Sequence, residues 1–74
     1  MSTPTIKEAI DKAVRAAGGQ APLARAVGVK PQAVHQWIAN GRIPAERVVA
    51  VERAANGMVG RHELRPDLYQ PSHA

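Results

Sequence analysis

Three polar side chains in the middle of the chain have a spacing that places them on one face of a helix. His35 lies three residues after Gln32, and Gln36 lies four residues after it. A glutamine amide offers a donor and an acceptor side by side, which matches the edge of an adenine, and an imidazole can meet guanine or a phosphate. Ala33 could lie against a thymine methyl group. These four residues are the predicted base contacts of a DNA-reading helix, although Gln36 and His35 would look the same as plain solvated surface residues.

The charges around this stretch favour a polyanionic partner. Between Asp11 and Glu46 the chain has no acidic residue but has five basic ones, and its formal net charge is +4. This distribution is typical of a surface that neutralises phosphates, although chance clustering of bases would look similar. The predicted phosphate contacts flank the reading face at helix ends. They are Gln20, Lys30, Asn40 and Arg42, with Arg47 and Arg25 as weaker candidates. Arg25 could equally pair with an acid.

Two short helices are predicted to position these side chains. Apolar residues at helical spacing favour one helix from about Gln20 to Val27 and a second over about residues 31–39. In the second helix the inward stripe is Val34, Trp37 and Ile38. Trp37 is therefore assigned to the core rather than to the reading face.

Gly28 lies between the two helices, where the chain must turn sharply. Glycine adopts a positive φ without a Cβ penalty, and Ala24 leaves room for the two backbones to pack closely. Two short helices joined by a tight glycine turn describe a helix-turn-helix. This motif inserts its second helix into the major groove and lays the first across it near the backbone.

Two further helices complete the predicted fold. One covers residues 5–17, with Ser2 or Thr3 as its cap and Pro4 in its first turn, and the other runs from about Pro44 to Ala55. The inward-facing residues of the later helix are Val48, Val51 and Ala55. The predicted fold class is all-α, a compact four- to five-helix bundle with a helix-turn-helix.

The chain is predicted to form one DNA-binding domain over residues 1–60, followed by a C-terminal tail over residues 61–74. Residues 61–64 could form one helical turn, and residues 70–74 are expected to be disordered. Four apolar residues have no evident place in the core and are predicted to contact a second copy or another partner. They are Val49, Leu64, Leu68 and Tyr69. The alternative is that the tail packs against the helix over residues 44–55.

Composition disfavours several other classes of protein. The chain has no cysteine, which excludes disulfides, and 74 residues bury only a thin core, so homodimerisation is the expected extra source of stability. The three histidines, His35, His62 and His73, lack metal-ligand spacing. Neither a positioned nucleophile nor a phosphate-binding loop is present, so we expect no enzyme activity and no cofactor. The N-terminal stretch reads as neither a signal peptide nor a membrane span, and we expect a cytoplasmic protein.

The helix-turn-helix pattern resembles the Cro-type repressors of phages, which have a lambda-repressor-like DNA-binding domain. Over Gln20 to Tyr69 the chain is similar to the YdaS-like antitoxin and Cro-like group of prophage regulators. A homodimer would bind a near-palindromic operator whose half-sites lie about one helical turn apart. The resemblance implies a repressor of a phage or prophage promoter. Some relatives are antitoxins, so it also implies an alternative, an interaction module that binds a toxin or a polymerase subunit through its C-terminal apolar residues. The chain departs from the pattern at Lys30, where serine or threonine would cap the reading helix.

Overall fold

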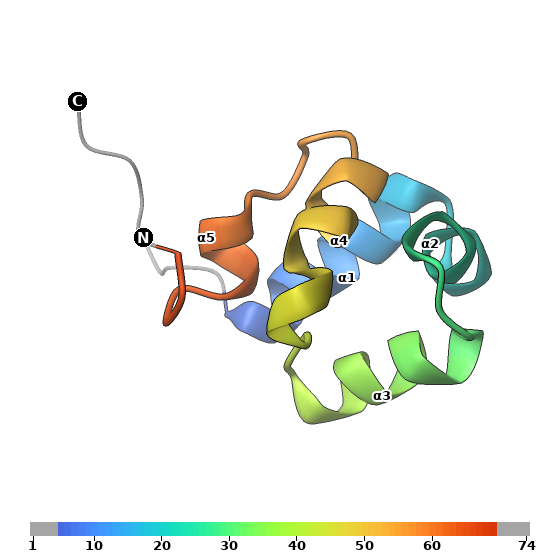
Figure 1. Cartoon of the computed structure of the whole chain (residues 1–74), viewed down its shortest axis with the longest axis horizontal. Coiled ribbons are helices and arrows are strands. Elements are labelled where there is room, and N and C mark those ends of the chain that lie inside the picture. Colours follow the sequence, from blue (N-terminus) through green and yellow to red (C-terminus); the bar gives the residue numbers. More distant parts are fainter. Residues whose placement is uncertain (1–4, 70–74) are drawn as a thin grey trace.

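The computed structural model describes residues 5–69, which form five α-helices and one short 3₁₀ helix joined by tight turns (Figure 1). In chain order the helices are α1 (Ile6–Ala17), α2 (Gln20–Val27), α3 (Pro31–Asn40), η1 (Ala45–Arg47), α4 (Val48–Ala54) and α5 (Arg61–Leu64). Helix α1 packs against all four other α-helices, and α3 lies along one edge of the molecule. The expectations for Pro4 and for residues 70–74 lie outside the described residues. Within residues 5–69, no helix is long and apolar enough to cross a bilayer.

Helix α1 begins two or three residues later than the predicted cap would place it. The Glu8 backbone N–H donates to Thr5 Oγ1 at 3.1 Å, and Thr5 itself is extended, with φ −75° and ψ 163°. Thr5 is therefore the N-cap, which corrects the prediction of Ser2 or Thr3. A threonine three residues before a glutamate is typical of a helix start, which explains why the helix is capped by Thr5.

The turn between α2 and α3 has the predicted glycine conformation. Gly28 has φ 89° and ψ 30°, and the backbone N–H groups of Gly28 and Val29 both donate to the Ala24 carbonyl, at 2.8 and 2.9 Å. A Cβ at position 28 would meet nothing within 4 Å, so the backbone angle rather than space requires glycine there. Ala24 is 1% exposed, which agrees with its predicted place in close packing against a neighbour.

The helix predicted over residues 44–55 is divided in two. Pro44 is extended, with φ −56° and ψ 142°, and its carbonyl accepts from the Arg47 N–H at 2.9 Å, which makes the first turn a 3₁₀ turn. Arg47, with φ −106° and ψ −7°, is the last residue of η1, and α4 follows directly at Val48. The predicted inward stripe of this helix is fully buried: Val48, Val51 and Ala55.

The C-terminal segment packs on the same core as the other helices. The predicted helical turn is present as α5, and the Gly60 N–H donates to Glu63 Oε1 at 3.0 Å at its start. Leu64 has no exposed area and lies in one cluster with residues of α1 to α4. Leu64 as a dimer or partner contact is therefore corrected, because a fully buried side chain offers no surface to a partner. The boundary predicted at residue 60 does not separate residues 61–69 from the core.

Candidate nucleic-acid interface

Helix α3 presents the predicted reading face to solvent. Gln32, His35 and Gln36 are all exposed, whereas Val34 is fully buried and Trp37 is 6% exposed on the opposite side. The apolar side anchors the helix to the core, so the three polar side chains are held outward by packing. No acidic residue lies on α3 or within its first turn. The prediction that Trp37 belongs to the core is confirmed.

Ala33 is placed less favourably than the other predicted base contacts. It is partly buried and packs against the core, because it lies one turn before Trp37 on the same side of α3. Only part of its methyl group remains accessible to a thymine. Ile38, predicted to be inward, is likewise partly buried against the core.

The predicted phosphate contacts lie at helix ends. Gln20 is the first residue of α2, Lys30 is the N-cap residue of α3, and Asn40 is the last residue of α3. Lys30 makes no side-chain capping hydrogen bond and is exposed, so its ammonium group extends into solvent. The first turns of α2 and α3 contain no acidic residue, which leaves the positive ends of both helix dipoles uncompensated by side chains. Both helix starts can therefore face an anion.

Two arginines complete the predicted set. Arg42 follows α3 and its side chain is 69% exposed, while Arg47 is partly buried in η1. The weaker candidate Arg25 is exposed in the last turn of α2. Arg42 is thus the most accessible cation close to the end of the reading helix.

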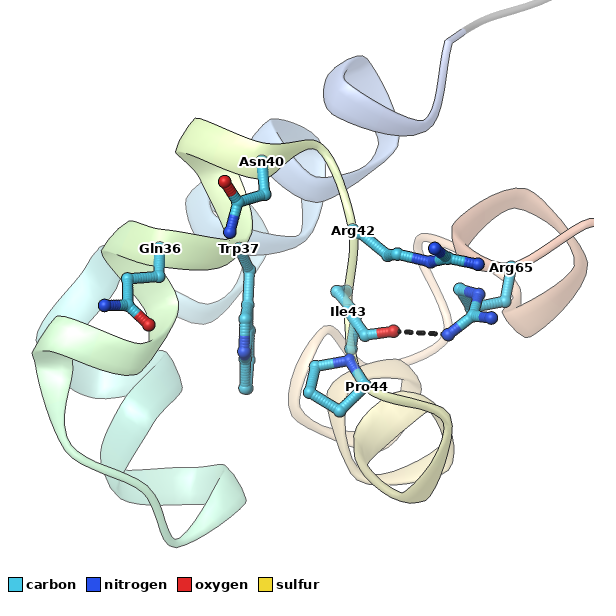
Figure 2. Close-up of a pocket in the computed structure, with 7 residues that line it drawn as sticks. All are labelled: Gln36, Trp37, Asn40, Arg42, Ile43, Pro44 and Arg65. Carbon is cyan, nitrogen blue, oxygen red and sulfur yellow. Dashed lines mark hydrogen bonds between the residues drawn. The ribbon is translucent and has the colours of Figure 1, made fainter.

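A hollow of about 660 Å³ adjoins the end of α3 (Figure 2). It is lined by Gln36, Trp37, Asn40, Arg42, Ile43, Pro44 and Arg65. In Figure 2 the Trp37 indole stands between α3 and the segment that carries Ile43 and Pro44. The hollow therefore joins a predicted base contact, two predicted phosphate contacts and a C-terminal arginine at one place on the surface.

Arg65 fastens the C-terminal segment to the loop after α3. It is 7% exposed, its Nη1 donates to the Ile43 carbonyl at 2.7 Å, and its Nε and Nη2 donate to the two carboxylate oxygens of Asp67 at 3.0 and 2.7 Å. Sequence reasoning did not single out Arg65. The only signal was the Arg-Pro-Asp spacing, which does not reveal a hydrogen bond to a residue 22 positions away.

Asp67 brings a carboxylate close to one predicted phosphate contact. Its Oδ2 lies 3.7 Å from Arg42 Nη2, and its side chain is 49% exposed. The hydrogen bonds from Arg65 lower the pKa of Asp67 to about 2, so the carboxylate is ionised at neutral pH. Of the predicted DNA contacts, Arg42 is the one with an ion-pair partner in the described part of the chain.

A separate ion pair, between Arg61 and Glu52, holds the start of α5. Arg61 donates to the Glu52 carboxylate from its backbone N–H at 3.0 Å and from its Nη2 at 2.8 Å. The same contacts lower the pKa of Glu52. The Arg61 guanidinium also lies over the Tyr69 ring, 5.6 Å from its centroid. Tyr69 is thus partly covered by its own chain.

The other predicted partner contacts differ in accessibility. Leu68 is 47% exposed, whereas Val49 and Tyr69 are partly buried. Met58, which sequence reasoning did not select, is 60% exposed at the turn after α4. Leu68 and Met58 are the two large apolar side chains exposed among residues 5–69.

The helix-turn-helix, with the polar face of α3 turned outward, defines the structural class of the protein. Similarity to known proteins defines its family. Residues 10–73 match the family described as "Bacterial toxin YdaS", and the chain belongs to it. The expected resemblance to the YdaS and Cro-like group is confirmed, although the family description names a toxin, where we expected antitoxins.

Two relatives agree with this assignment. The chain is 54% identical over 52 residues to YdaS of Escherichia coli (strain K12), a protein named as a candidate transcriptional regulator. The match covers 69% of this chain and 53% of that protein, so the chain spans about half the length of this relative. The chain is also similar to the Cro protein from the candidate prophage element Xfaso 1 of Xylella fastidiosa strain Ann-1, with a TM-score of 0.82 and 44% identity. That match covers 85% of this chain and 97% of the Cro chain and confirms the predicted all-α helix-turn-helix fold.

Proposed function

We propose that this chain is a sequence-specific DNA-binding transcriptional regulator of the Cro-like prophage type. The observation that carries the proposal is the outward, acid-free face of α3, which presents Gln32, His35 and Gln36 to solvent while Val34 and Trp37 fix the helix to the core. Similarity to the Xfaso 1 Cro protein and to E. coli YdaS supports the same role. In this role the protein acts in the bacterial cytoplasm, bound to the nucleoid.

The proposed complex inserts α3 into the major groove. The amides of Gln32 and Gln36 would each pair with the edge of an adenine, and His35 would meet a guanine or a phosphate. Because Ala33 is partly buried, it can contribute only a partial contact between its methyl group and a thymine methyl. The proposed phosphate contacts remain Gln20, Lys30, Asn40, Arg42 and Arg47, which hold the helix in register without reading sequence.

The proposed functional unit is a homodimer on a near-palindromic operator. Two copies would place their reading helices in successive major grooves, about one helical turn or roughly 34 Å apart. Leu68, which is exposed, is the proposed dimer contact, with Val49 and Tyr69 at its edge. The expected biological result is repression of a neighbouring promoter.

The salt dependence of DNA affinity tests the proposal. The protein should bind DNA from upstream of its own gene, and log affinity should fall against log salt with a slope of about −1.8 or steeper per protomer. Lys30 and Arg47 are two cationic phosphate contacts, and Arg42, which is paired with Asp67, adds at most one more. The Arg42→Ala variant should weaken binding to specific and unrelated sequences alike. Absence of binding at low salt, or a slope near zero, would contradict a DNA-binding role.

A protein-interaction module is the second candidate function. The observation that favours it is the exposure of Leu68 and Met58, two large apolar side chains in the C-terminal half of the chain. On this view they would dock on a toxin or a polymerase subunit, and the helix-turn-helix would serve as a scaffold. The burial of Leu64 removes one of the residues on which this alternative first depended. Flat salt dependence, together with loss of partner capture in the Leu68→Ser variant, is what this alternative predicts.

A further inference from the structure

The carboxylate of Asp67 is held in a fixed place beside the loop after α3. Two hydrogen bonds from Arg65, at 2.7 and 3.0 Å, fix both of its oxygens, and Arg65 is in turn anchored to the Ile43 carbonyl at 2.7 Å. Since Arg65 is buried, this arrangement cannot rotate freely. The carboxylate is therefore a fixed negative charge beside Arg42 and Arg65, two of the residues that line the hollow in Figure 2.

Arg42 lies between this carboxylate and the reading helix. Its guanidinium is 3.7 Å from Asp67 Oδ2, its side chain is 69% exposed, and it lines the same hollow as Gln36 and Asn40. A DNA phosphate that reached this hollow would have to draw the guanidinium away from Asp67 or share it with the carboxylate. Two anions close to one cation also repel each other. The phosphate would thus gain less from Arg42 than it would from an unpaired arginine.

Resting on the proposed DNA-binding function, we infer that Asp67 is a built-in competitor of DNA phosphate for Arg42 and lowers the affinity of the protein for DNA. The C-terminal segment then weakens DNA binding through Arg42, without touching a base. The pKa of Asp67, lowered to about 2, keeps the competing charge in place at every pH at which duplex DNA is stable.

A double-mutant cycle on DNA affinity tests this inference. The four proteins are the wild type, Asp67→Asn, Arg42→Gln and the double variant, measured by fluorescence anisotropy on one operator fragment at about 0.1 M salt. Asp67→Asn should raise the affinity about two- to fivefold when Arg42 is present, as expected for release of an exposed ion pair. The gain should be clearly smaller in the Arg42→Gln background. The long-range effect of removing a negative charge enters both backgrounds and cancels.

Equal gains in both backgrounds, or a loss of affinity in Asp67→Asn, would overturn the inference. Glu46→Gln, which removes an exposed carboxylate from η1, is the matched control and should show no coupling to Arg42. If the wild type bound no DNA, the proposed function itself would fail. If the wild type bound DNA but Asp67 and Arg42 showed no coupling, this inference would be wrong and the proposed function would stand.

A second measurement keeps the test decisive if Asp67→Asn is poorly folded. In an otherwise wild-type protein, Lys30→Gln should reduce the magnitude of the log-log salt slope by about 0.9, as loss of one full phosphate contact does. Arg42→Gln should reduce it by clearly less, because Asp67 already neutralises part of the Arg42 charge. Lys30 is a suitable reference because it is exposed and no ion pair to it is found within residues 5–69. Equal reductions in the two variants would contradict the competition.

Discussion

The Leu64→Ala variant is expected to lose about 2–5 kcal/mol of unfolding free energy, because it opens a cavity in the core. Leu64 has no exposed area and joins α5 to the shared apolar cluster. A domain of 74 residues has a total stability of roughly 4–11 kcal/mol, so this loss would remove a large fraction of the total stability. The C-terminal segment is then a structural part of the domain.

Urea denaturation followed by circular dichroism measures this effect, and Leu68→Ala is its matched control. Leu68 is the same residue type four positions later but is 47% exposed, so its truncation should cost at most about 0.5 kcal/mol. Similar stabilities for the two variants would show that Leu64 is not buried in the core in solution.

Replacing Arg65 with methionine is expected to lower the free energy of unfolding by about 2–4 kcal/mol. Methionine keeps the apolar length of the side chain but removes three hydrogen bonds, to the Ile43 carbonyl and to both oxygens of Asp67. Loss of the hydrogen bond to the buried Ile43 carbonyl accounts for most of the lost stability, because that carbonyl is left unpaired. The half-exposed Asp67 carboxylate can be hydrated instead, so losing its bonds costs less. Arg53→Met, on the exposed side of α4, should cost less than about 1 kcal/mol.

The dependence of stability on acid pH is a second test of the Arg65→Met variant. The pKa of Asp67 is about 2 in the folded protein, because Arg65 donates to its carboxylate, and 3.8 ordinarily. A lowered folded-state pKa contributes stability that is complete above the ordinary pKa and is lost as the pH falls toward the folded value. The wild type should therefore lose this contribution between about pH 4 and pH 2, and Arg65→Met should lose correspondingly less over the same range. Identical acid dependence of the two proteins would argue against the pairing.

Local signals accounted for the first half of the fold. The bounds of α2 were predicted within a residue because Gly28 ends the helix through a left-handed conformation that the sequence makes visible. The stripes of α3 and α4 followed from helical periodicity, and Val34, Val48 and Val51 are fully buried as expected. These features depend on residues within about two turns of one another, which is the range that pattern reasoning covers.

Features that depend on distant residues were missed. Leu64 was assigned to a partner contact, with packing of the tail against the helix over residues 44–55 as the alternative. In the structure α5 packs on α1 and α4 and Leu64 is fully buried, so for Leu64 the alternative was the correct one. Arg65 looked like one more surface base, because its bond to Ile43 spans 22 residues. The first turn after Pro44 is a 3₁₀ turn rather than the α-helical turn that was expected there.

The reading face was predictable to the same extent as the helix that carries it. Gln32, His35 and Gln36 follow from the buried stripe alone, since residues opposite Val34 and Trp37 must face outward. The partial burial of Ala33 and the neighbouring carboxylate at Arg42 could not be foreseen. Both depend on how other segments pack around the helix.

Base preference measured position by position tests the central proposal most directly. The affinities of Gln32→Ala and Gln36→Ala would be compared with the wild type on operator fragments in which each base pair is replaced in turn, after footprinting upstream of the gene locates the site. Each variant should lose about 1–3 kcal/mol of discrimination at one base pair, whereas Gln20→Ala, the same truncation at the start of α2, should weaken binding uniformly. If both α3 variants bound more weakly but kept the wild-type base preference at every position, α3 would not be the element that reads the DNA.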